Sequence, residues 1–321
     1  MSKRHLSQQQ QRRIKARRQR SEYEADGGDL DTAGLVIARF GKQVLVEDPA
    51  GTTIRCHLRS HLDGLVAGDR VLFNLGDDGL GVVTAQQPRM NALSRPDARG
   101  KLRAVAANID LMLVVIAPTP EPYRNLIDRY LVAAELAGID VALVLNKGDL
   151  LTDEHPYRDW LLEYEQLGYA VLTTSDQLSE DAALTDLISG KTLVLVGQSG
   201  VGKSSIIGRL LPDLDIKVGA LSESVGKGRH TTTAARVFQL PCGSRLIDSP
   251  GIREFGLSHI SASDVANGFR EFHDFLGNCE FRDCQHRSEP GCALHHARDN
   301  GLVSAARYDS FERILASLEA N

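Results

Sequence analysis

Residues 197–205 read Gly197-Gln198-Ser199-Gly200-Val201-Gly202-Lys203-Ser204-Ser205. The stretch follows an apolar run at residues 193–196 and opens a helical pattern, so it is a P-loop in the strand, loop and helix context that this motif requires. Its glycines let backbone N–H groups turn toward the β- and γ-phosphates of a nucleotide. Lys203 neutralises charge there, and the Ser204 hydroxyl can ligate Mg²⁺. The stretch predicts an α/β domain that binds a nucleotide where a strand ends.

The sequence on both sides of this stretch alternates short apolar runs with amphipathic segments. We predict strands at residues 109–117, 141–145, 170–174, 192–196, 236–240 and 245–247. We predict helices at residues 126–136, 160–167 and 204–211. Apolar runs separated by helices indicate strands buried on both faces of a largely parallel sheet, which binds ligands at the strand ends. We assign this α/β domain to residues 98–258.

The predicted strand 141–145 is directly followed by Asn146-Lys147-Gly148-Asp149, which resembles the guanine-specificity motif of GTPases. A carboxylate at Asp149 can accept from N1–H and the 2-amino group of guanine, whereas adenine would leave it desolvated and unpaired. Asn146 can bond the far edge of the base, and the Lys147 stem can cover one face of the ring. We expect Thr173-Thr174-Ser175, at the end of the next strand, to supply backbone N–H contacts to the guanine oxygen.

A second phosphate-binding element is predicted at Asp248-Ser249-Pro250-Gly251, which ends the strand 245–247 and looks like the Asp-x-x-Gly switch of GTPases. Asp248 would lie beside Mg²⁺, and the Gly251 amide would sense the γ-phosphate. Residues 226–233 form a glycine- and threonine-rich loop that could fold over the nucleotide. One of Thr231, Thr232 and Thr233 would reach Mg²⁺, and the sequence leaves open which one.

The turnover of this site is predicted to be slow. Many GTPases place a glutamine directly after the Asp-x-x-Gly glycine to position the attacking water. Here that position is Ile252, which cannot do so. His230 is the best candidate to orient the water once a partner has ordered its loop. The alternative is that His230 contacts only RNA or solvent.

The order of these motifs differs from that of ordinary GTPases, which place the P-loop first and the guanine motif last. Here Asn146 precedes Gly197. The elements therefore occur in circularly permuted order, which preserves a site because sheet and loops need only meet in space. The permutation makes the switch at Asp248 lead directly into the C-terminal segment.

The C-terminal segment, residues 259–321, combines helical patterns with a metal-binding pattern. Cys279-x4-Cys284-x-His286-x5-Cys292 offers three thiolates and one imidazole, the set that a closed, structural Zn²⁺ site uses. A disulfide pair and an iron–sulfur cluster are the alternatives, and His295 or His296 could replace His286. Two stripes, Val265, Phe269, Phe272 and Leu276, then Tyr308, Phe311, Leu315 and Leu318, predict helices that pack through these side chains. Cys56 and Cys242 are expected to be small core residues.

The N-terminal part combines a basic arm with an all-β unit. Residues 1–20 hold eight basic side chains and no acidic one, in a chain whose net charge is −5. We expect this arm and its linker, residues 1–30 in all, to be disordered when free and to suit a polyphosphate surface such as RNA, although a solvated tail is the plainer alternative. Five strands, at 35–40, 43–47, 53–58, 70–74 and 81–85, predict an OB-type barrel over residues 31–88, with an SH3-like barrel not excluded.

The composition excludes several classes of protein. The chain has 321 residues, of which 42% are hydrophobic and 25% charged, near the averages of globular proteins. No apolar run approaches the roughly 18–20 residues that cross a bilayer, so no membrane partner is expected. The start of the chain is basic without an apolar core segment, and the five cysteines are an odd number. These features predict a protein of the reducing cytoplasm, with a monomer as the default state.

Together these residues resemble one family, the circularly permuted, small-subunit-dependent ribosome-biogenesis GTPases of the RsgA (YjeQ) type. The resemblance rests on the barrel, on Arg89-x-Asn91-x-Leu93-x-Arg95-Pro96, on Ala107-Asn108-Ile109-Asp110, and on the motifs at 146–149, 197–205, 228–233, 248–251 and 279–292. It implies an OB domain, a permuted GTPase domain and a zinc domain. It also implies binding to the small (30S) ribosomal subunit and its rRNA late in maturation, GTP hydrolysis stimulated by that subunit, and release of another assembly factor.

The residues alone leave three other interpretations open. The first is a nucleic-acid-binding module in which GTP is only a conformational ligand. The second is a P-loop kinase or ATPase, which Asn146 and Asp149 disfavour. The third is a permuted GTPase that acts on the large subunit, against which only the resemblance argues.

Overall fold

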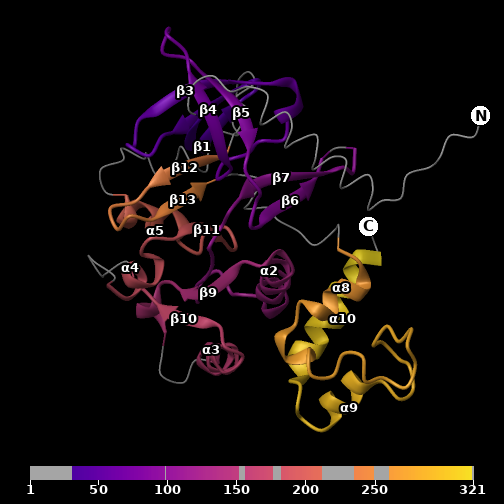
Figure 1. Cartoon of the computed structure of the whole chain (residues 1–321). Coiled ribbons are helices and arrows are strands. Elements are labelled where there is room, and N and C mark those ends of the chain that lie inside the picture. Colours follow the sequence, from indigo (N-terminus) through magenta and orange to yellow (C-terminus); the bar gives the residue numbers. More distant parts are fainter. Residues whose placement is uncertain are drawn as a thin grey trace, which may run out of the picture.

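The computed structural model describes residues 31–97, 99–151, 156–175, 182–211, 235–248 and 260–319. Figure 1 shows a barrel at the top, a sheet flanked by helices below it, and a helical C-terminal part at the lower right. Within the described ranges, no helix has the length and apolar character needed to cross a membrane. The basic arm, the loop that holds His230, Thr231, Thr232 and Thr233, and the residues Gly251 and Ile252 lie outside these ranges.

The barrel is formed by five strands in the order β1-β2-β3-β5-β4, and β4 pairs with β1 to close it. The strands are β1 (Thr32–Phe40), β2 (Gln43–Glu47), β3 (Thr53–Leu58), β4 (Arg70–Leu75) and β5 (Gly81–Gln86), with a short 3₁₀ turn, η1 (Ser60–Leu62), after β3. All five predicted strands are present. Only β3 and β5 pair in parallel, and the other pairs are antiparallel. This closed five-stranded arrangement is an OB-like barrel, filled by Val36, Val44, Val46, Val71 and Phe73.

The central sheet has the strand order β10-β9-β8-β11-β13-β12. Its strands are β8 (Leu111–Ile116), β9 (Asp140–Leu145), β10 (Ala170–Thr173), β11 (Thr192–Val196), β12 (Arg236–Gln239) and β13 (Arg245–Asp248). The first five in this order pair in parallel, as predicted. The exception is β12, which is antiparallel to β13 and mostly unburied. It also pairs with β1 at Ala38 and Arg236, so the sheet runs on into the barrel.

Two layers of helices cover the central sheet, as the apolar runs predicted. One face packs against α2 (Arg124–Ala137) and α3 (Tyr157–Gln166), and the other against α4 (Ala182–Ile188) and α5 (Lys203–Leu210). Every residue of β8 is buried. Met112, Val114 and Ile116 belong to the first core, whereas Leu111, Leu113 and Val115 belong to the second. The alternation of strand side chains therefore fills both layers at once.

Between barrel and sheet the chain forms a hairpin, β6 (Ala92–Pro96) and β7 (Leu102–Ala107), where no strand was predicted. Asn91 accepts from the Ile109 amide at 2.8 Å and donates to the Ile109 carbonyl at 2.8 Å. Asn108, with φ of +54°, accepts from the Met90 amide at 2.9 Å and donates to the Gly68 carbonyl at 2.8 Å. Asn91 thus occupies both backbone groups of Ile109, and β8 begins at Leu111 and not at the predicted position 109.

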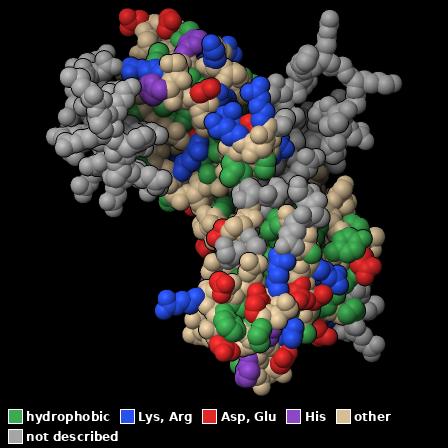
Figure 2. Space-filling view, turned by 90° about the vertical axis from the view of Figure 1, so that its right-hand side faces the viewer, with side chains coloured by type: hydrophobic (Ala, Val, Ile, Leu, Met, Phe, Trp, Pro, Cys, Tyr) green, Lys and Arg blue, Asp and Glu red, His purple; other side chains and the backbone are tan. Residues whose placement is uncertain are grey.

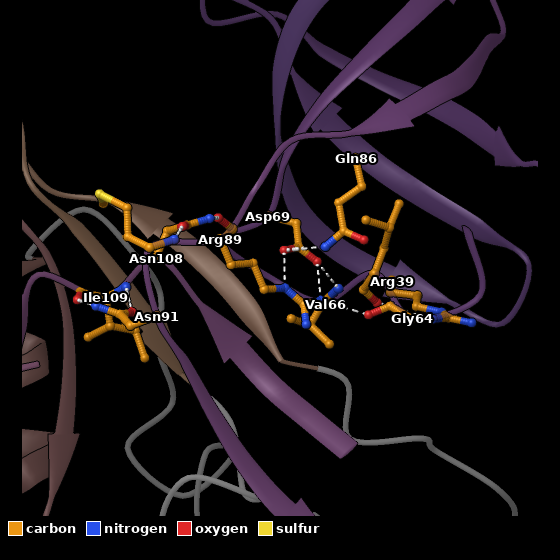
Figure 3. A network of polar contacts seen from close by, with 12 residues as sticks. Arg39, Gly64, Val66, Asp69, Gln86, Arg89, Asn91, Asn108 and Ile109 are labelled. Carbon is orange, nitrogen blue, oxygen red and sulfur yellow. Dashed lines mark hydrogen bonds and ion pairs between the residues drawn. The ribbon is translucent and has the colours of Figure 1, made fainter. Parts of the chain in front are cut away.

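Figure 3 shows a second part of this junction, centred on the Asp69 carboxylate. Asp69 is fully buried and accepts from Arg89 Nε at 2.6 Å, from Gln86 Nε2 at 3.1 Å and from the Val66 amide at 2.7 Å. A buried carboxylate is stable only when it is paired in this way. Arg89 and Asn91 both belong to the motif Arg89-x-Asn91-x-Leu93-x-Arg95-Pro96. This motif therefore joins the end of the barrel to the start of the central sheet.

The C-terminal part contains α8 (Ala262–Asn267), η3 (Arg270–Phe272), α9 (Ala293–Asp299) and α10 (Ala305–Glu319). The first stripe predicts a single helix. This prediction was wrong, because α8 ends at Asn267 and Gly268 is its C-cap residue. A side chain there would bring a Cβ within 2.5 Å of Val132 on α2, so the backbone packs directly on that helix. Phe269, Phe272, Tyr308 and Phe311 still share one core, as predicted, and Val132 and Ala133 of α2 belong to the same core.

A buried ion pair joins the C-terminal part to the central domain. Arg307 on α10 and Asp128 on α2 are both fully buried, with 2.5 Å between Nη1 and Oδ1. Arg307 also donates to Glu271 at 2.6 Å, and the Tyr164 hydroxyl donates to Asp128 at 2.6 Å. Burial alone would lower the pKa of Arg307, but the two carboxylates outweigh it and raise that pKa above its usual value. Arg307 therefore keeps its positive charge although it is buried.

We predict that Arg307→Met costs about 3–5 kcal/mol in the free energy of unfolding, because it leaves buried carboxylates without their cation. Urea unfolding followed through Trp160, the single tryptophan of the chain, on α3, measures this loss. Arg313→Met is the matched control, since Arg313 pairs with Asp309 at 3.0 Å on the exposed side of α10. It should cost less than about 1 kcal/mol. Equal losses in the two variants would contradict the structural role of the buried pair.

Candidate functional site

The parallel strands bring the predicted motifs to one edge of the central sheet. Asn146 follows β9, Thr174 follows β10, and Gly197 follows β11, while Asp248 is the last residue of β13. Because the strands run in the same direction, their carboxyl ends lie side by side, which is where ligands bind on such sheets. Motifs far apart and permuted in sequence therefore meet in space.

The phosphate loop has the backbone that its glycines allow. Gly197 has φ of +134°, and a Cβ there would lie 2.1 Å from the Val115 carbonyl oxygen of the neighbouring strand. Gly202 has φ of +95°, and its Cβ would lie 2.0 Å from Asn146 Nδ2. Left-handed backbone at such points forms a concave nest of N–H groups. The loop thus presents backbone donors to an anion.

The helix after the loop begins at Lys203. The Lys203 ammonium donates to the carbonyl oxygens of Gly197 at 2.7 Å and Gln198 at 2.5 Å, so it is held against the loop as its predicted role requires. Ser204 lies in the first turn of α5, half-buried, and Ser205 is exposed. Tyr130 on α2 lies beside Gly197 and Gln198 of this loop, and burial raises its pKa. No sequence motif indicates this tyrosine.

The guanine motif is bonded directly to the phosphate loop. Asn146 is fully buried, and its Nδ2 donates to the Val201 carbonyl at 3.0 Å. Lys147 has φ of +57°, and its ammonium donates to the carbonyls of Gly200 and Thr119, both at 2.8 Å. Among the described residues, Asn146 Oδ1 is buried without a hydrogen-bond partner, which leaves an acceptor for a ligand. Asn146 and Lys147 therefore both tie the guanine motif to the phosphate loop.

The third predicted loop lies beside the guanine motif. Thr173 is exposed and Thr174 is buried, with the Gly148 amide donating to the Thr174 carbonyl at 3.0 Å. The Ser175 hydroxyl donates to Asp149 Oδ1 at 2.6 Å, and Asp149 itself is exposed at the edge. Arg209 of α5 also contacts this loop, which the sequence did not indicate. The structure thus brings the predicted motif at 146–149 together with the loop 173–175 and with the phosphate loop.

The metal-ligand pattern forms a compact cluster in the C-terminal part. His286 Nδ1 lies 3.4 Å from Cys279 Sγ, 3.7 Å from Cys284 Sγ and 3.5 Å from Cys292 Sγ. The four ligand atoms all lie within 4.8 Å of one another. All five cysteines of the chain are free, so the disulfide alternative was wrong. The imidazole of the cluster is His286, and neither His295 nor His296 belongs to it.

Neighbouring groups hold this cluster in shape. The Ala293 amide donates to Cys279 Sγ at 3.3 Å, and the Tyr308 hydroxyl donates to the His286 carbonyl at 2.6 Å. Glu289 accepts from the amides of Gln285 and Arg287, which lowers the pKa of Glu289 to about 2. Burial lowers the pKa of His286, which favours the neutral imidazole that metals bind. Of the two other cysteines, Cys56 is buried in the barrel as predicted, but Cys242 is only half-buried.

A P-loop in contact with a guanine-type motif, on a parallel sheet whose motifs occur in permuted order, defines a circularly permuted GTPase. Comparisons with known proteins give the family. The RsgA GTPase family matches residues 86–258. The chain therefore belongs to the RsgA GTPase family and is a GTP-hydrolysing enzyme.

Relatives and solved structures agree with this assignment. The chain is 51% identical to the small ribosomal subunit biogenesis GTPase RsgA of Pseudomonas fluorescens, with 100% of this chain and 99% of that one covered. It is 52% identical to the protein of the same name from Ectopseudomonas mendocina, with 99% and 98% covered. Its fold is similar to that of YjeQ from Thermotoga maritima, with a TM-score of 0.75, 29% identity, and 91% and 100% covered. It also shares its fold with YloQ, a circularly permuted GTPase, with a TM-score of 0.73, 24% identity, and 92% and 97% covered.

We predict that Gly202→Ala weakens GDP binding by about tenfold or more, because alanine opposes the left-handed backbone and its methyl group displaces Asn146. Isothermal titration with GDP measures the change. Gly208→Ala in α5 is the control, since a Cβ there meets nothing within 4 Å. The control should keep its GDP affinity and gain about 0.4–1 kcal/mol of stability. GDP affinity in Gly202→Ala equal to that of the unmodified protein would contradict the assigned loop geometry.

Proposed function

We propose that this GTPase acts in ribosome assembly, binding the small ribosomal subunit and its rRNA late in maturation. The observation that carries the proposal is the direct bonding of Asn146 and Lys147 to the phosphate loop, in a chain that matches, over its whole length, relatives named for small-subunit biogenesis. The first supports guanine-nucleotide binding at this site, and the second supports the assembly role.

The nucleotide would bind along the carboxyl edge of the sheet. Asp149 pairs with N1–H and the 2-amino group of guanine, and the loop 173–175 closes around the base. The amides of residues 197–202 and the Lys203 ammonium hold the phosphates of GTP or GDP. Mg²⁺ would be held by Ser204, with Asp248 beside it and one of Thr231, Thr232 and Thr233 completing the set. Mg²⁺ supplies charge neutralisation for phosphoryl transfer.

Hydrolysis by the free protein is expected to be slow, since Ile252 stands where many GTPases position water through glutamine. We assign the water-orienting role to His230, together with ordering of its loop by the bound subunit. The Gly251 amide would report the γ-phosphate, and the chain continues from there into the C-terminal domain. Hydrolysis would then accompany the release of another assembly factor from the subunit.

The cysteine and histidine cluster fits one Zn²⁺ ion. Tetrahedral Zn²⁺ with Zn–S of about 2.3 Å and Zn–N of about 2.0 Å separates sulfur from nitrogen by about 3.5 Å. The three observed separations are 3.4, 3.5 and 3.7 Å. Four protein ligands close the coordination sphere, so the ion would stabilise the fold of the C-terminal domain and would not activate water.

The RNA would be bound by basic side chains outside the nucleotide site. The β6–β7 hairpin exposes four basic side chains, those of Arg95, Arg99, Lys101 and Arg103, and has a single acidic residue, Asp97. Figure 2 draws the side of the molecule that lies at the right in Figure 1. On this side, Lys and Arg side chains gather on the upper part, whereas acidic and basic side chains are mixed on the lower part. Together with the basic arm, this surface suits the phosphates of folded RNA. We propose that the protein works as a monomer in the cytoplasm.

Steady-state GTP hydrolysis tests the assembly role. We expect small subunits to accelerate hydrolysis strongly, and large subunits or naked RNA at the same salt concentration to have little effect. His230→Ala should lower the stimulated rate about a hundredfold. No stimulation by small subunits would reject the proposal in favour of an RNA-binding module gated by GTP. An unchanged stimulated rate in His230→Ala would reject only the role of His230.

Metal analysis tests the zinc assignment. We expect one zinc ion per chain in the purified protein. Cys284→Ser should lose this ion and lower the Tm, whereas Cys242→Ser should keep both, because Cys242 lies outside the cluster and contacts Ser244. Iron in place of zinc, or a Tm that does not change when the metal is removed, would refute the structural zinc site.

A further inference from the structure

Arg209 connects the helix of the phosphate loop to the loop that follows β10. It lies near the end of α5, and its Nη1 donates to the Ser175 carbonyl at 3.0 Å. Its Nη2 donates to the Thr174 hydroxyl at 2.9 Å. The guanidinium therefore spans two consecutive residues, which suits its planar set of donors.

The two residues that Arg209 holds are themselves bonded to the guanine motif. The Thr174 amide donates to the Leu145 carbonyl at 2.8 Å, and the Thr174 carbonyl accepts from the Gly148 amide at 3.0 Å. The Ser175 hydroxyl donates to Asp149 Oδ1 at 2.6 Å. A continuous series of contacts thus runs from α5 through Thr174 and Ser175 to the carboxylate that would read the base.

These contacts complete a closed ring of three loops. The guanine motif bonds to the phosphate loop through Asn146 and Lys147, and the loop 173–175 bonds to the guanine motif. Arg209 joins the loop 173–175 back to α5, the helix that begins at the phosphate loop. The base contact and the phosphate contact are therefore set by one connected frame.

We propose that Arg209 is a positioning residue for base specificity. By holding Thr174 and Ser175, it fixes Asp149 in the orientation that pairs with both N1–H and the 2-amino group of guanine. This inference rests on the proposed nucleotide site. Charge-assisted hydrogen bonds weaken steeply when they are misaligned, so a freed Asp149 would keep one contact with guanine and lose the other. The phosphates bind at the opposite end of α5 and would be held as before.

Comparing GDP with IDP tests the proposal, because IDP lacks only the 2-amino group. The unmodified protein should bind GDP about tenfold more tightly than IDP, the value of one hydrogen bond to a charged group. Arg209→Met keeps the length of the side chain and removes its donors. We expect this variant to lose most of the preference, to about two- or threefold, by weakening GDP binding more than IDP binding. Arg209→Lys, with a single ammonium, should fall between the two.

A merely structural role for Arg209 would weaken GDP and IDP binding by the same factor and would leave the GDP to IDP ratio unchanged. An unchanged ratio would therefore overturn the proposal. Ser175→Ala supplies an independent variant on the same path. If Arg209 acts through Ser175, the double variant should show no smaller preference than Ser175→Ala alone. Additive losses would place Arg209 outside this path and would also overturn the proposal.

Two controls separate the outcomes. Arg313→Met removes an exposed arginine from α10 and should leave the GDP to IDP ratio unchanged. Binding of ADP by the unmodified protein as tight as that of GDP would reject the guanine site itself, and the inference with it. A preserved preference for GDP over ADP together with an unchanged GDP to IDP ratio in Arg209→Met would reject only the role of Arg209.

Discussion

The nucleotide site depends on the parallel pairing of β8 with β9 on one side and with β11 on the other. This pairing buries every side chain of β8 between two helical layers and forces neighbouring loops to leave the sheet at one edge. Strand adjacency, and not chain order, then decides which loops meet. For this reason Asn146 can donate to Val201 although the guanine motif precedes the phosphate loop in the chain.

Helix α2 extends this arrangement to the rest of the molecule, because it belongs to two cores. Ile127 and Leu131 pack against the central sheet, while Val132 and Ala133 pack with the C-terminal helices. Tyr130 of the same helix lies beside Gly197, the first residue of the phosphate loop. The buried pair of Asp128 and Arg307 holds the same helix to α10. Helix α2 therefore lies between the central sheet and the C-terminal helices α8 and α10 (Figure 1).

The barrel is joined to the central domain in a different way, through backbone pairing and side-chain amides. β12 pairs with β1, so one sheet continues through both parts. Asn91 and Asn108 replace ladder bonds where the chain turns from the hairpin into β8. Each amide both donates and accepts, which lets one side chain satisfy two backbone groups at a buried bend. Such a junction restricts the barrel to one position on the sheet.

The candidate site residues could be located in the sequence because their motifs are local. Each motif occupies one short stretch, as in the glycines of 197–202, the Asn-Lys-Gly-Asp turn and the Cys279 to Cys292 pattern. Apolar periodicity located every strand of the barrel and of the central sheet, but it did not locate β6 and β7. Contacts between distant segments left no such pattern. Packing alone brings together residues from separate elements, as in the pairs Arg209 with Ser175, Tyr130 with Gly197, and Asp128 with Arg307. The sequence therefore determined which groups are candidates for the nucleotide and metal sites, whereas the tertiary structure determined how they are held, because orientation arises from neighbours far away in the chain.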